Sequence, residues 1–260
     1  LGACVSGVGM IGKDDPSRTL KTLLDCDLNI DAHLLGTSRP ISNKVRFIAT
    51  SQHLMRLDSE VCDLIGDAEM AELVAIIEPL IPSHDVIVLS DYEKGLLSPV
   101  LLKNIIELAN DCKKMVVVDP KNKDFSCYSG ASILTPNSLE VERAVGFSIS
   151  TDAEAELAGH LLLKDVDVSA ILITRGSKGM SLISVDDDPL HLTSRALDVF
   201  DVVGAGDTVI ATLACSMALG GGMALASAAA NLAAGLVVAK PDTATVTPGG
   251  LLDRRISPSP

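Results

Sequence analysis

Residues 198–217 read DVFDVVGAGDTVIATLACSM, and the fold and function expected of the chain both start from this stretch. A short β-rich run at 199–203 leads into a Gly-Ala-Gly turn, after which Asp207 and Thr208 open a long apolar helix. Glycine lets the backbone approach a ligand closely, and a helix start offers unpaired N–H groups that suit a phosphate or oxyanion. Asp207 would then lie at the mouth of an anion hole, where a carboxylate can act as a general base. An ordinary helix cap is the alternative, because Asp is a preferred N-cap residue.

The composition is that of a globular protein. The chain has 260 residues, of which 47% are hydrophobic, enough for one domain or one domain with a small appendage. Apolar runs stay shorter than about 18 residues, so no transmembrane helix is expected. A net charge of −13 and the absence of Trp argue against general affinity for nucleic acid or anionic membranes. The six cysteines lack a C-x-x-C pair, which is typical of reduced thiols in a cytoplasmic protein. The histidines show no metal-ligand spacing.

The middle of the chain alternates Val/Ile/Leu runs with helical segments. We expect buried strands at residues 85–89, 115–119, 131–134 and 169–174, separated by helices at residues 99–110, 137–145 and 152–164. Antiparallel strands are expected at 181–185 and 190–193, and two further helices at 208–219 and 223–238. Near-continuous apolar strands separated by helices indicate a parallel sheet covered on both faces. The predicted fold class is α/β, with a doubly wound, mainly parallel sheet and helices on both faces.

The first eighty residues predict a smaller group of elements. They comprise a strand within residues 1–10, a helix at 16–26, extended structure at 27–35 and a helix at 67–80. Charged and apolar side chains alternate within residues 42–58 with a period of two, which is typical of half-exposed strands. We expect two strands joined near Ser51 and Gln52, forming a β flap or lid. A solvated strand face is the alternative explanation for the basic residues of this segment.

Polar residues follow each predicted parallel strand. They are residues 90–91, 119–121, 135–137 and 174–179, and the Gly-Ala-Gly-Asp turn closes the series. Ligands of doubly wound sheets lie at the carboxyl ends of the strands. These loops are therefore the expected source of ligand-binding residues.

Three of these loops resemble the PfkB, or ribokinase, family of carbohydrate kinases. DVVGAGDT at 201–208 is similar to the C-terminal signature of the family, PNSLE at 136–140 to its N-x-x-E motif and TRGSKG at 174–179 to its nucleotide loop. Asn231 matches a position that lies beside the adenine in the family. The resemblance implies a ribokinase-like kinase domain over residues 1–260, with ATP and Mg²⁺ as cofactors and a homodimer in which flap strands pair.

The resemblance also implies a role for the residues of each motif. The backbone amides of Gly204, Ala205 and Gly206 would stabilise the charge of the γ-phosphoryl group, and Asp207 would accept the proton of the sugar hydroxyl. The implied nucleotide-binding residues are Asn137, Glu140, Thr174, Gly176, Gly179 and Asn231. Glu140 would act on Mg²⁺ through water, because Mg²⁺ keeps several of its waters, and no direct protein ligand is expected. N-x-x-E at a helix start is also the spacing of a capping box, which is the alternative.

Finer stretches resemble the heptose 7-phosphate kinases of the family, which form the kinase half of a bifunctional ADP-heptose synthesis protein. These stretches are HLMRLD at 53–58, LSDYEKG at 89–95, DPKNKDF at 119–125 and ITRGSKGMSL at 173–182. The implied reaction is ATP-dependent phosphorylation of heptose 7-phosphate at the anomeric hydroxyl, giving the 1,7-bisphosphate for the lipopolysaccharide core. A sugar phosphate needs cations, and the available ones are Lys44, Arg46, Arg56, Lys94 and Lys121, with Arg the better phosphate ligand. A fructose- or ribose-type kinase and an inactive nucleotide-binding fragment are the alternatives.

The chain also departs from the family pattern. The N-terminal strand with an acidic substrate ligand and the Gly-Gly segment with its Asn are not seen, and we expect Leu1 to lie just beyond them. The chain would then retain the nucleotide half of the site and lack much of the acceptor half. Pro241 and Asp242 replace a Gly-containing turn, which weakens the case for a monovalent cation site near Thr243. Arg175 stands where the family often has an uncharged residue, and no H-x-G-H nucleotidyltransferase motif is present.

Overall fold

The structure, a computed structural model, describes residues 1–26, 29–49, 52–196, 199–240 and 243–252. The chain divides into two units. The larger unit consists of Leu1–Gly2, Ile81–Tyr92 and Ile106–Pro260, and the smaller unit of Ala3–Leu80 and Glu93–Ile105. All the strands that were expected to carry the site loops belong to the larger unit.

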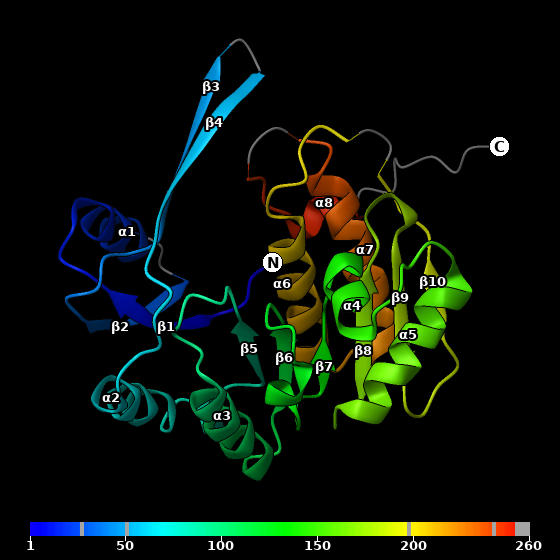
Figure 1. The fold of residues 1–260 in the computed structure, drawn as a ribbon, viewed down its shortest axis with the longest axis horizontal. Helices are drawn as coiled ribbons and strands as arrows, with labels where there is room; N and C mark the ends of the chain where they lie inside the picture. The colour runs from blue at the N-terminus through cyan, green and yellow to red at the C-terminus, as the bar shows by residue number, and fades with distance from the viewer. Residues whose placement is uncertain (27–28, 50–51, 197–198, 241–242, 253–260) are drawn as a thin grey trace. The chain divides into compact units, whose positions relative to one another are not determined.

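A six-stranded sheet forms the centre of the larger unit (Figure 1). Its strands lie in the order β10-β9-β8-β7-β6-β5 and comprise β5 (Val86–Ser90), β6 (Met115–Asp119), β7 (Ile133–Leu134), β8 (Ala170–Thr174), β9 (Met180–Ser184) and β10 (Leu190–Leu192). Strands β5 to β8 are parallel, and β9 and β10 are antiparallel additions. Val116, Val117 and Val118 of β6 are fully buried, as expected for a strand covered on both faces. The predicted mainly parallel sheet is confirmed.

Helices cover both faces of this sheet. The helices that come after β5 in the chain are α3 (Pro99–Asp111), α4 (Ser138–Val145), α5 (Asp152–Asp165), α6 (Ala205–Ala218), α7 (Met223–Val237) and α8 (Pro248–Leu252). Helices α4 and α5 pack on β8, and α5 comes so close to β9 that a β-carbon at Gly159 would lie 2.7 Å from Ile183. The opposite face packs on α6 and α7, where Leu172 and Leu213 belong to one buried cluster.

The smaller unit contains a parallel strand pair and a separate hairpin. Strand β1 (Val5–Ile11) pairs with β2 (Ile30–Gly36), α1 (Asp15–Asp25) connects them, and α2 (Asp67–Ile77) packs on both strands. The Arg39 guanidinium donates to the carbonyl oxygens of Val61 and Lys94 at 2.9 and 3.2 Å. These bonds tie the segment after β2 to two later parts of the chain.

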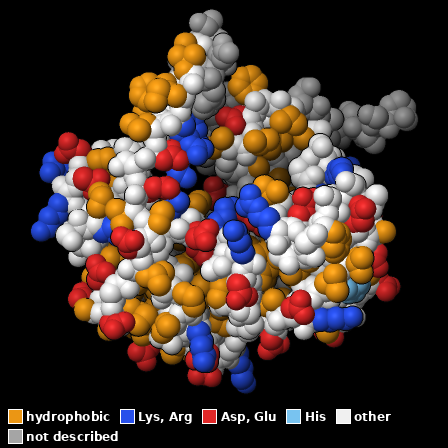
Figure 2. Space-filling model, in the orientation of Figure 1, with side chains coloured by type: hydrophobic (Ala, Val, Ile, Leu, Met, Phe, Trp, Pro, Cys, Tyr) orange, Lys and Arg blue, Asp and Glu red, His pale blue; other side chains and the backbone are white. Residues whose placement is uncertain are grey.

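The hairpin consists of β3 (Asn43–Ala49) and β4 (Gln52–Ser59), which pair antiparallel. Val45 lies opposite Leu57 and Phe47 opposite Met55, so one face of the hairpin is apolar, and these side chains are 40–55% exposed. Figure 2 shows hydrophobic side chains gathered along the hairpin. Its expected turn at Ser51 lies outside the described residues. The function of residues 42–58 as a lid stays a prediction.

The strand predicted at residues 199–203 is not formed, and the chain is irregular there. Phe200 and Asp201 donate their N–H groups to the carbonyl oxygen of Val238 at 2.7 and 3.2 Å, so this segment binds to the end of α7 and not to a strand. Valine-rich segments form strands only where a neighbouring strand is available to pair. Helix α6 begins at Ala205, earlier than the sequence pattern predicts.

In the described ranges, no helix is both long and apolar enough to cross a bilayer. All six cysteines carry free thiols. The frayed tail expected at residues 258–260 and the turn at residues 241–242 lie outside the described residues.

Candidate active site

The Gly-Ala-Gly turn forms the first turn of α6. Gly204 is the N-cap, with φ of 78°, a left-handed conformation that disfavours residues with a β-carbon. A β-carbon at Gly204 would also lie 2.8 Å from Cγ2 of Thr243, whereas one at Gly206 would meet no atom within 4 Å. The N–H of Ala205 donates to the carbonyl oxygen of Val202 at 3.2 Å, so this amide is engaged within the turn. The open side of the turn therefore lies at Gly206.

Asp207 is the third residue of α6 and is not its N-cap. Negative charge in the first turn is favoured by the helix dipole. Oδ1 of Asp207 accepts a hydrogen bond of 2.6 Å from the Tyr92 hydroxyl, which comes from the loop after β5. The carboxylate is thus tied to the carboxyl end of the sheet, as expected for a residue of a site formed by the strand-end loops.

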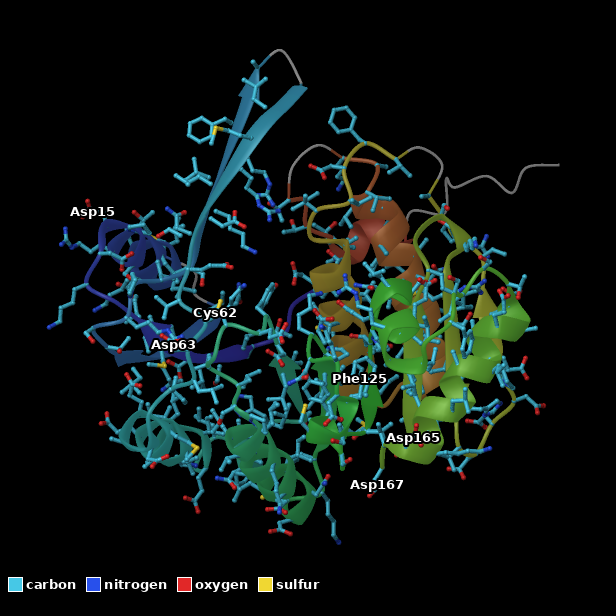
Figure 3. All side chains as sticks on the ribbon, in the orientation of Figure 1. Asp15, Cys62, Asp63, Phe125, Asp165 and Asp167 are labelled. Carbon is cyan, nitrogen blue, oxygen red and sulfur yellow. The ribbon has the colours of Figure 1, made fainter. Side chains whose placement is uncertain are left out.

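The loops after β5 and β6 are fastened to each other by Tyr128. This buried side chain donates to Oδ2 of Asp91 at 2.6 Å and accepts from the N–H groups of Lys121 and Asn122 at 3.2 Å. Phe125, which is labelled in Figure 3, packs edge-to-face on Tyr128, with ring centroids 6.3 Å apart. Because Asp91 and Tyr128 are almost fully buried, this network fixes the position of the loop that carries Lys121.

Lys121 and Glu140 form an ion pair in this group. Nζ of Lys121 donates to Oε1 of Glu140 at 2.5 Å, and the Glu140 side chain is 8% exposed. The hydrogen bond with Glu140 and the nearby charges of Asp119 and Asp207 raise the pKa of Lys121 against the opposing effect of burial. Lys121 is therefore a cation held among three carboxylates.

Asp119 lies at the carboxyl end of β6, and its pKa is affected by three other carboxylates. Burial raises the pKa of Asp119 to about 7, and the charges of Glu140, Asp207 and Asp91 add to the rise, while Lys121 opposes it. The effect of these side chains on Asp119 shows that loops far apart in the sequence come together. Sequence reasoning placed Asp91 and Asp119 among the loop residues but assigned neither a role.

Asn137 and Glu140 form a capping box at the start of α4. Oδ1 of Asn137 accepts from the N–H of Glu140 at 3.0 Å, and Oε2 of Glu140 accepts from the N–H of Asn137 at 2.8 Å. The capping alternative for the N-x-x-E motif therefore holds in the structure. Both carboxylate oxygens of Glu140 have protein partners, Asn137 and Lys121.

The loop after β8 lies beside this helix start. Asn137 and Thr174 form a parallel bridge, and the N–H of Thr174 donates to the carbonyl oxygen of Pro136 at 2.9 Å. Gly176 and Gly179 have φ of 57° and 87°, both in the left-handed region. At Gly179 a β-carbon would lie 1.9 Å from the carbonyl oxygen of Leu192, so only glycine fits there. The turn is therefore tight and has an exposed backbone at Gly176.

Arg175 of the same loop serves the scaffold. Its side chain is 3% exposed, and Nη1 donates to Asp152 at 2.5 Å and to the Ser181 hydroxyl at 2.8 Å. These bonds join the β8 loop to α5 and β9. Asn231, on α7, is also buried, and its Nδ2 donates to the carbonyl oxygen of Thr193 at 2.8 Å.

Four of the five basic residues expected at a sugar phosphate lie in the smaller unit, and Lys121 lies in the larger one. Arg46 lies opposite Arg56 and Lys44 opposite Asp58 on the polar face of the hairpin. Nε of Arg56 donates to Oδ1 of Asp58 at 2.8 Å. Nζ of Lys94 donates to Glu60 at 2.6 Å and to Sγ of Cys62 at 3.7 Å.

Two tyrosines of the site were missed by sequence reasoning. Tyr92 bonds to Asp207, which lies 115 residues away in the chain, and Tyr128 bonds to Asp91. The available signal was the place of Tyr92 directly after a strand-end Asp, within the stretch LSDYEKG. Neither partner could be identified from spacing.

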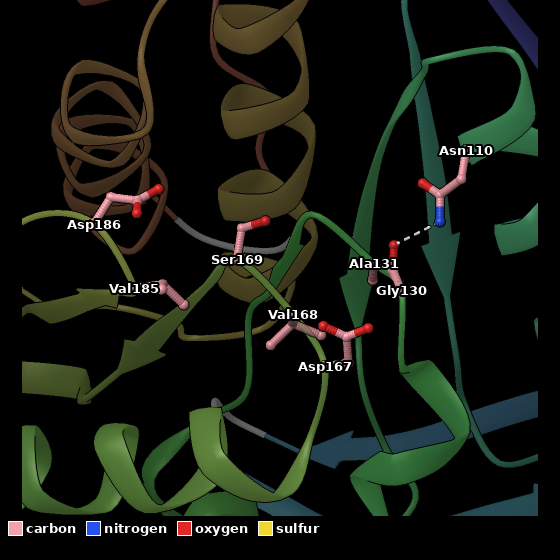
Figure 4. A pocket seen from close by; sticks show the side chains of 8 residues that line it. All are labelled: Asn110, Gly130, Ala131, Asp167, Val168, Ser169, Val185 and Asp186. Carbon is pink, nitrogen blue, oxygen red and sulfur yellow. Dashed lines mark hydrogen bonds between the residues drawn. The ribbon is translucent and has the colours of Figure 1, made fainter.

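A cavity of about 400 Å³ lies at the other end of the sheet (Figure 4). It is lined by Asn110 of α3 and by residues that precede β7 and β8 and follow β9, namely Gly130, Ala131, Asp167, Val168, Ser169, Val185 and Asp186. The strand-end loops are not part of it. In the part of the chain that the structure describes, no group of three or more His, Cys, Asp and Glu side chains is arranged to hold a metal ion.

An Asp119→Asn variant is expected to gain stability over the wild type as the pH rises. The folded protein keeps the Asp119 proton up to about pH 7, whereas an unfolded Asp loses it near 3.8, so wild-type stability falls across this window. Asn does not titrate, so the variant lacks this decrease in the free energy of unfolding with pH. A pKa shift contributes about 1.4 kcal/mol per pH unit. The difference in the free energy of unfolding between variant and wild type should therefore grow by about 2 kcal/mol from about pH 5 to about pH 7 and change little at higher pH.

Urea unfolding of both proteins in EDTA, from about pH 5 to about pH 8, measures this difference. Asp188→Asn, in an exposed turn, is the control. A difference in the free energy of unfolding that is the same at every pH would contradict the raised pKa of Asp119.

Comparisons with known proteins agree with this arrangement. A family model described as pfkB family carbohydrate kinase matches residues 1–249. The bifunctional protein HldE of Caulobacter vibrioides is 43% identical over 249 residues, which is 95% of this chain and 51% of that protein. HldE of Geobacter metallireducens is 39% identical over 253 residues, 97% of this chain and 52% of that protein. The chain thus spans about half the length of these relatives.

Solved structures share the fold. Phosphofructokinase-2 from Escherichia coli in complex with potassium has a TM-score of 0.80 at 14% identity, covering 97% of this chain and 81% of that one. Arabidopsis thaliana ribokinase complexed with ribose and ATP has a TM-score of 0.77 at 19% identity, covering 98% and 82%. The predicted ribokinase-like α/β fold is confirmed. Because the family model matches nearly the whole chain, the chain belongs to the pfkB family of carbohydrate kinases, phosphotransferases whose acceptor is a sugar.

Proposed function

We propose that the chain catalyses ATP-dependent phosphorylation of heptose 7-phosphate at its anomeric hydroxyl, giving the 1,7-bisphosphate. The family supports phosphoryl transfer to a sugar. The resemblance of residues 53–58, 89–95 and 119–125 to heptose 7-phosphate kinases supports the acceptor, and would place the reaction in ADP-heptose supply for the lipopolysaccharide core. The observation that carries the proposal is the Asp207 carboxylate in the first turn of α6, directly after an open glycine.

Asp207 is the proposed general base. Phosphoryl transfer needs in-line geometry, stabilisation of the charge on the transferred group and help in deprotonating the attacking hydroxyl. Asp207 would take the proton of the anomeric hydroxyl, and the oxygen would attack the γ-phosphorus. The N–H groups at Gly204 and Gly206 and the helix dipole would stabilise the negative charge of the γ-phosphoryl oxygens. The N–H of Ala205 could join them only by giving up its bond to Val202.

The residues present fit ATP with Mg²⁺. The charges of Glu140, Asp207 and Asp91 all raise the pKa of Asp119, and the charge of Lys121 lowers it. That surplus of carboxylates suits a hard divalent cation that prefers oxygen ligands. Since both oxygens of Glu140 are already hydrogen-bonded, Glu140 would hold Mg²⁺ through water. Mg²⁺ would neutralise charge on the ATP phosphates during transfer.

The nucleotide would lie along the loops after β7 and β8. The proposed contacts come from Asn137, Glu140, Thr174, Gly176, Gly179 and Asn231. The bridge between Asn137 and Thr174 supports this group, because it brings the two loops together. The exposed backbone at Gly176 and the burial of Asn231 beside Thr193 provide a polar turn and a fixed amide.

The phosphate of the substrate is proposed to bind the basic residues. The candidates are Lys44, Arg46, Arg56, Lys94 and Lys121. Arg46 and Arg56 lie directly opposite each other, and like charges in this position are destabilising. Asp58 accepts a hydrogen bond from Arg56, and a substrate phosphate would offset the charge of Arg46. Guanidinium groups also bind phosphate oxygens in a bidentate manner.

An Arg46→Ala variant is expected to raise the KM for the sugar phosphate by about 10-fold or more, because a hydrogen bond to a charged group contributes about 1.5–3 kcal/mol. The KM for ATP should stay the same. Rates of ADP release at varied sugar phosphate measure the effect. Arg18→Ala is the control, since Arg18 makes an exposed ion pair with Asp15. An equal rise in KM for the sugar without its phosphate would show that Arg46 does not bind the phosphate.

A homodimer is proposed through the apolar face of the hairpin. Val45, Phe47, Met55 and Leu57 form an exposed strip on it, and the resemblance to the family implies a homodimer in which flap strands pair. Light scattering of the wild type and of Phe47→Glu tests this: a dimer that becomes a monomer supports it, and a wild-type monomer contradicts it.

The proposed activity is tested by ADP release from the complete gene product with ATP, Mg²⁺ and a set of acceptors. Turnover with heptose 7-phosphate well above that with fructose, fructose 6-phosphate or ribose supports the proposal. Preference for one of the other sugars would make the chain a fructose- or ribose-type kinase. ATP binding without transfer to any acceptor would identify an inactive nucleotide-binding protein.

A further inference from the structure

We propose that Tyr92 is a positioning residue, whose hydroxyl holds one oxygen of the Asp207 carboxylate so that the other oxygen is free to take the acceptor proton. This inference rests on the proposed function of Asp207 as the base. The hydroxyl of Tyr92 donates to Oδ1 of Asp207 at 2.6 Å, a short and charge-assisted hydrogen bond. Within the described contacts, Oδ2 of Asp207 accepts no hydrogen bond.

The loop that presents Tyr92 is anchored at Asp91. Asp91 is 5% exposed, accepts the hydroxyl of Tyr128 and donates its N–H to the carbonyl oxygen of Asp119 at 3.1 Å. Glu93 has φ of 53°, a left-handed conformation that is uncommon for a residue with a β-carbon. Such strain tends to occur at functional sites, where the surroundings hold it in place. The phenol is therefore delivered from a fixed backbone rather than from a freely moving loop.

The hydroxyl is suited to remain a donor. Burial raises the pKa of Tyr92 to about 12, and the hydrogen bond to Asp207 adds to the rise. Tyr92 thus keeps its proton at every pH at which a kinase is assayed. During the reaction the acceptor proton would move to Oδ2 of Asp207, the acceptor oxygen would form its bond to the γ-phosphorus, and the bond to the leaving ADP oxygen would break. Tyr92 keeps its hydroxyl proton throughout this step.

Fixing one carboxylate oxygen should act on turnover and not on binding. A carboxylate without this bond can rotate, so that it faces the acceptor hydroxyl for only part of the time, and small misplacements of reacting groups cost up to about 10²-fold in rate. Tyr92→Phe removes only the hydroxyl. We expect kcat to fall by about 10- to 100-fold, while the KM values for ATP and the acceptor stay within about 2-fold.

The chain offers a matched control, because it contains two tyrosines and both donate to an Asp at 2.6 Å. Tyr128→Phe leaves the buried Asp91 without this donor and should lower the melting temperature. Tyr92→Phe should leave the melting temperature unchanged, since the Tyr92 side chain is 50% exposed.

The decisive comparison uses Tyr92→Phe, Asp207→Asn and the double variant. If Tyr92 acts through Asp207, the double variant is as slow as Asp207→Asn alone, because residues that act as a unit are non-additive. Additive losses, or a wild-type kcat for Tyr92→Phe, overturn the inference. If the wild type has no kinase activity, that result refutes the proposed function and not the inference about Tyr92. A crystal structure of Tyr92→Phe serves in either case: displacement or disorder of the Asp207 carboxylate supports the inference, and an unchanged carboxylate overturns it.

Discussion

An Asp207→Asn variant is expected to lose about 10²–10⁴-fold in kcat, because a general base contributes that much to proton transfer and an amide cannot accept the proton. The substitution keeps the size of the side chain, and the amide oxygen can still accept the hydrogen bond of Tyr92. The first turn of α6 should therefore be preserved. ADP release at saturating ATP and sugar phosphate measures the loss.

Binding and stability provide the controls for this variant. The dissociation constant of ATP should match that of the wild type. The melting temperature should fall by no more than about 2–4 °C, because Asp207 is exposed, is not the N-cap of α6 and contributes only its charge to the helix start. Asp201→Asn, just before the same glycine turn, is the matched substitution and should retain most of the activity. A wild-type kcat in Asp207→Asn would exclude Asp207 as the base.

Lys121→Met is expected to raise the KM for the sugar phosphate by about 10-fold or more, because Lys121 is proposed to bind the phosphate and a hydrogen bond to a charged group contributes about 1.5–3 kcal/mol. It should also lower the free energy of unfolding by about 1–2 kcal/mol, because the buried carboxylate of Glu140 loses its cation. That figure is below the usual cost for a fully buried pair, since the Lys121 side chain is 40% exposed. The pKa of Asp119 should rise further, because Lys121 is the cation that lowers it.

Lys123→Met is the control for this variant. Lys123 lies on the same loop, is exposed and carries the same charge. Kinetics at varied sugar phosphate and thermal unfolding at about pH 8 should separate the two variants. Equal behaviour would mean that the net charge of the loop matters, and not the ion pair between Lys121 and Glu140.

Most of the sheet follows from local sequence pattern. Strand β6 runs from Met115 to Asp119, the bounds that its apolar run predicts, and α3 and α7 end within a residue of the expected position. These segments are buried, so their hydrophobic pattern alone specifies them. The run at 199–203 has the same residue types but no strand beside it, and its N–H groups bond to Val238. Pairing of this kind depends on tertiary structure, which the sequence pattern does not contain.

The candidate site could be predicted as a set of loops but not as a set of bonds. Strand order brings together the loops that carry Asp91, Asp119 and Asn137, because the carboxyl ends of parallel strands share one edge. The pairs Tyr92–Asp207 and Lys121–Glu140 join different loops, and no spacing rule connects them. Glu140 illustrates the difference: its spacing predicts a capping box or a site residue, and the structure adds the ion pair.

The most direct measurement of the central claim is ³¹P NMR of the complete gene product with ATP, Mg²⁺ and heptose 7-phosphate. We predict a new phosphate signal coupled to the anomeric proton, formed in equal amount with ADP by the wild type and nearly absent with Asp207→Asn. A new phosphate at another position of the sugar, release of inorganic phosphate alone, or formation of the same product by Asp207→Asn at the wild-type rate would contradict it.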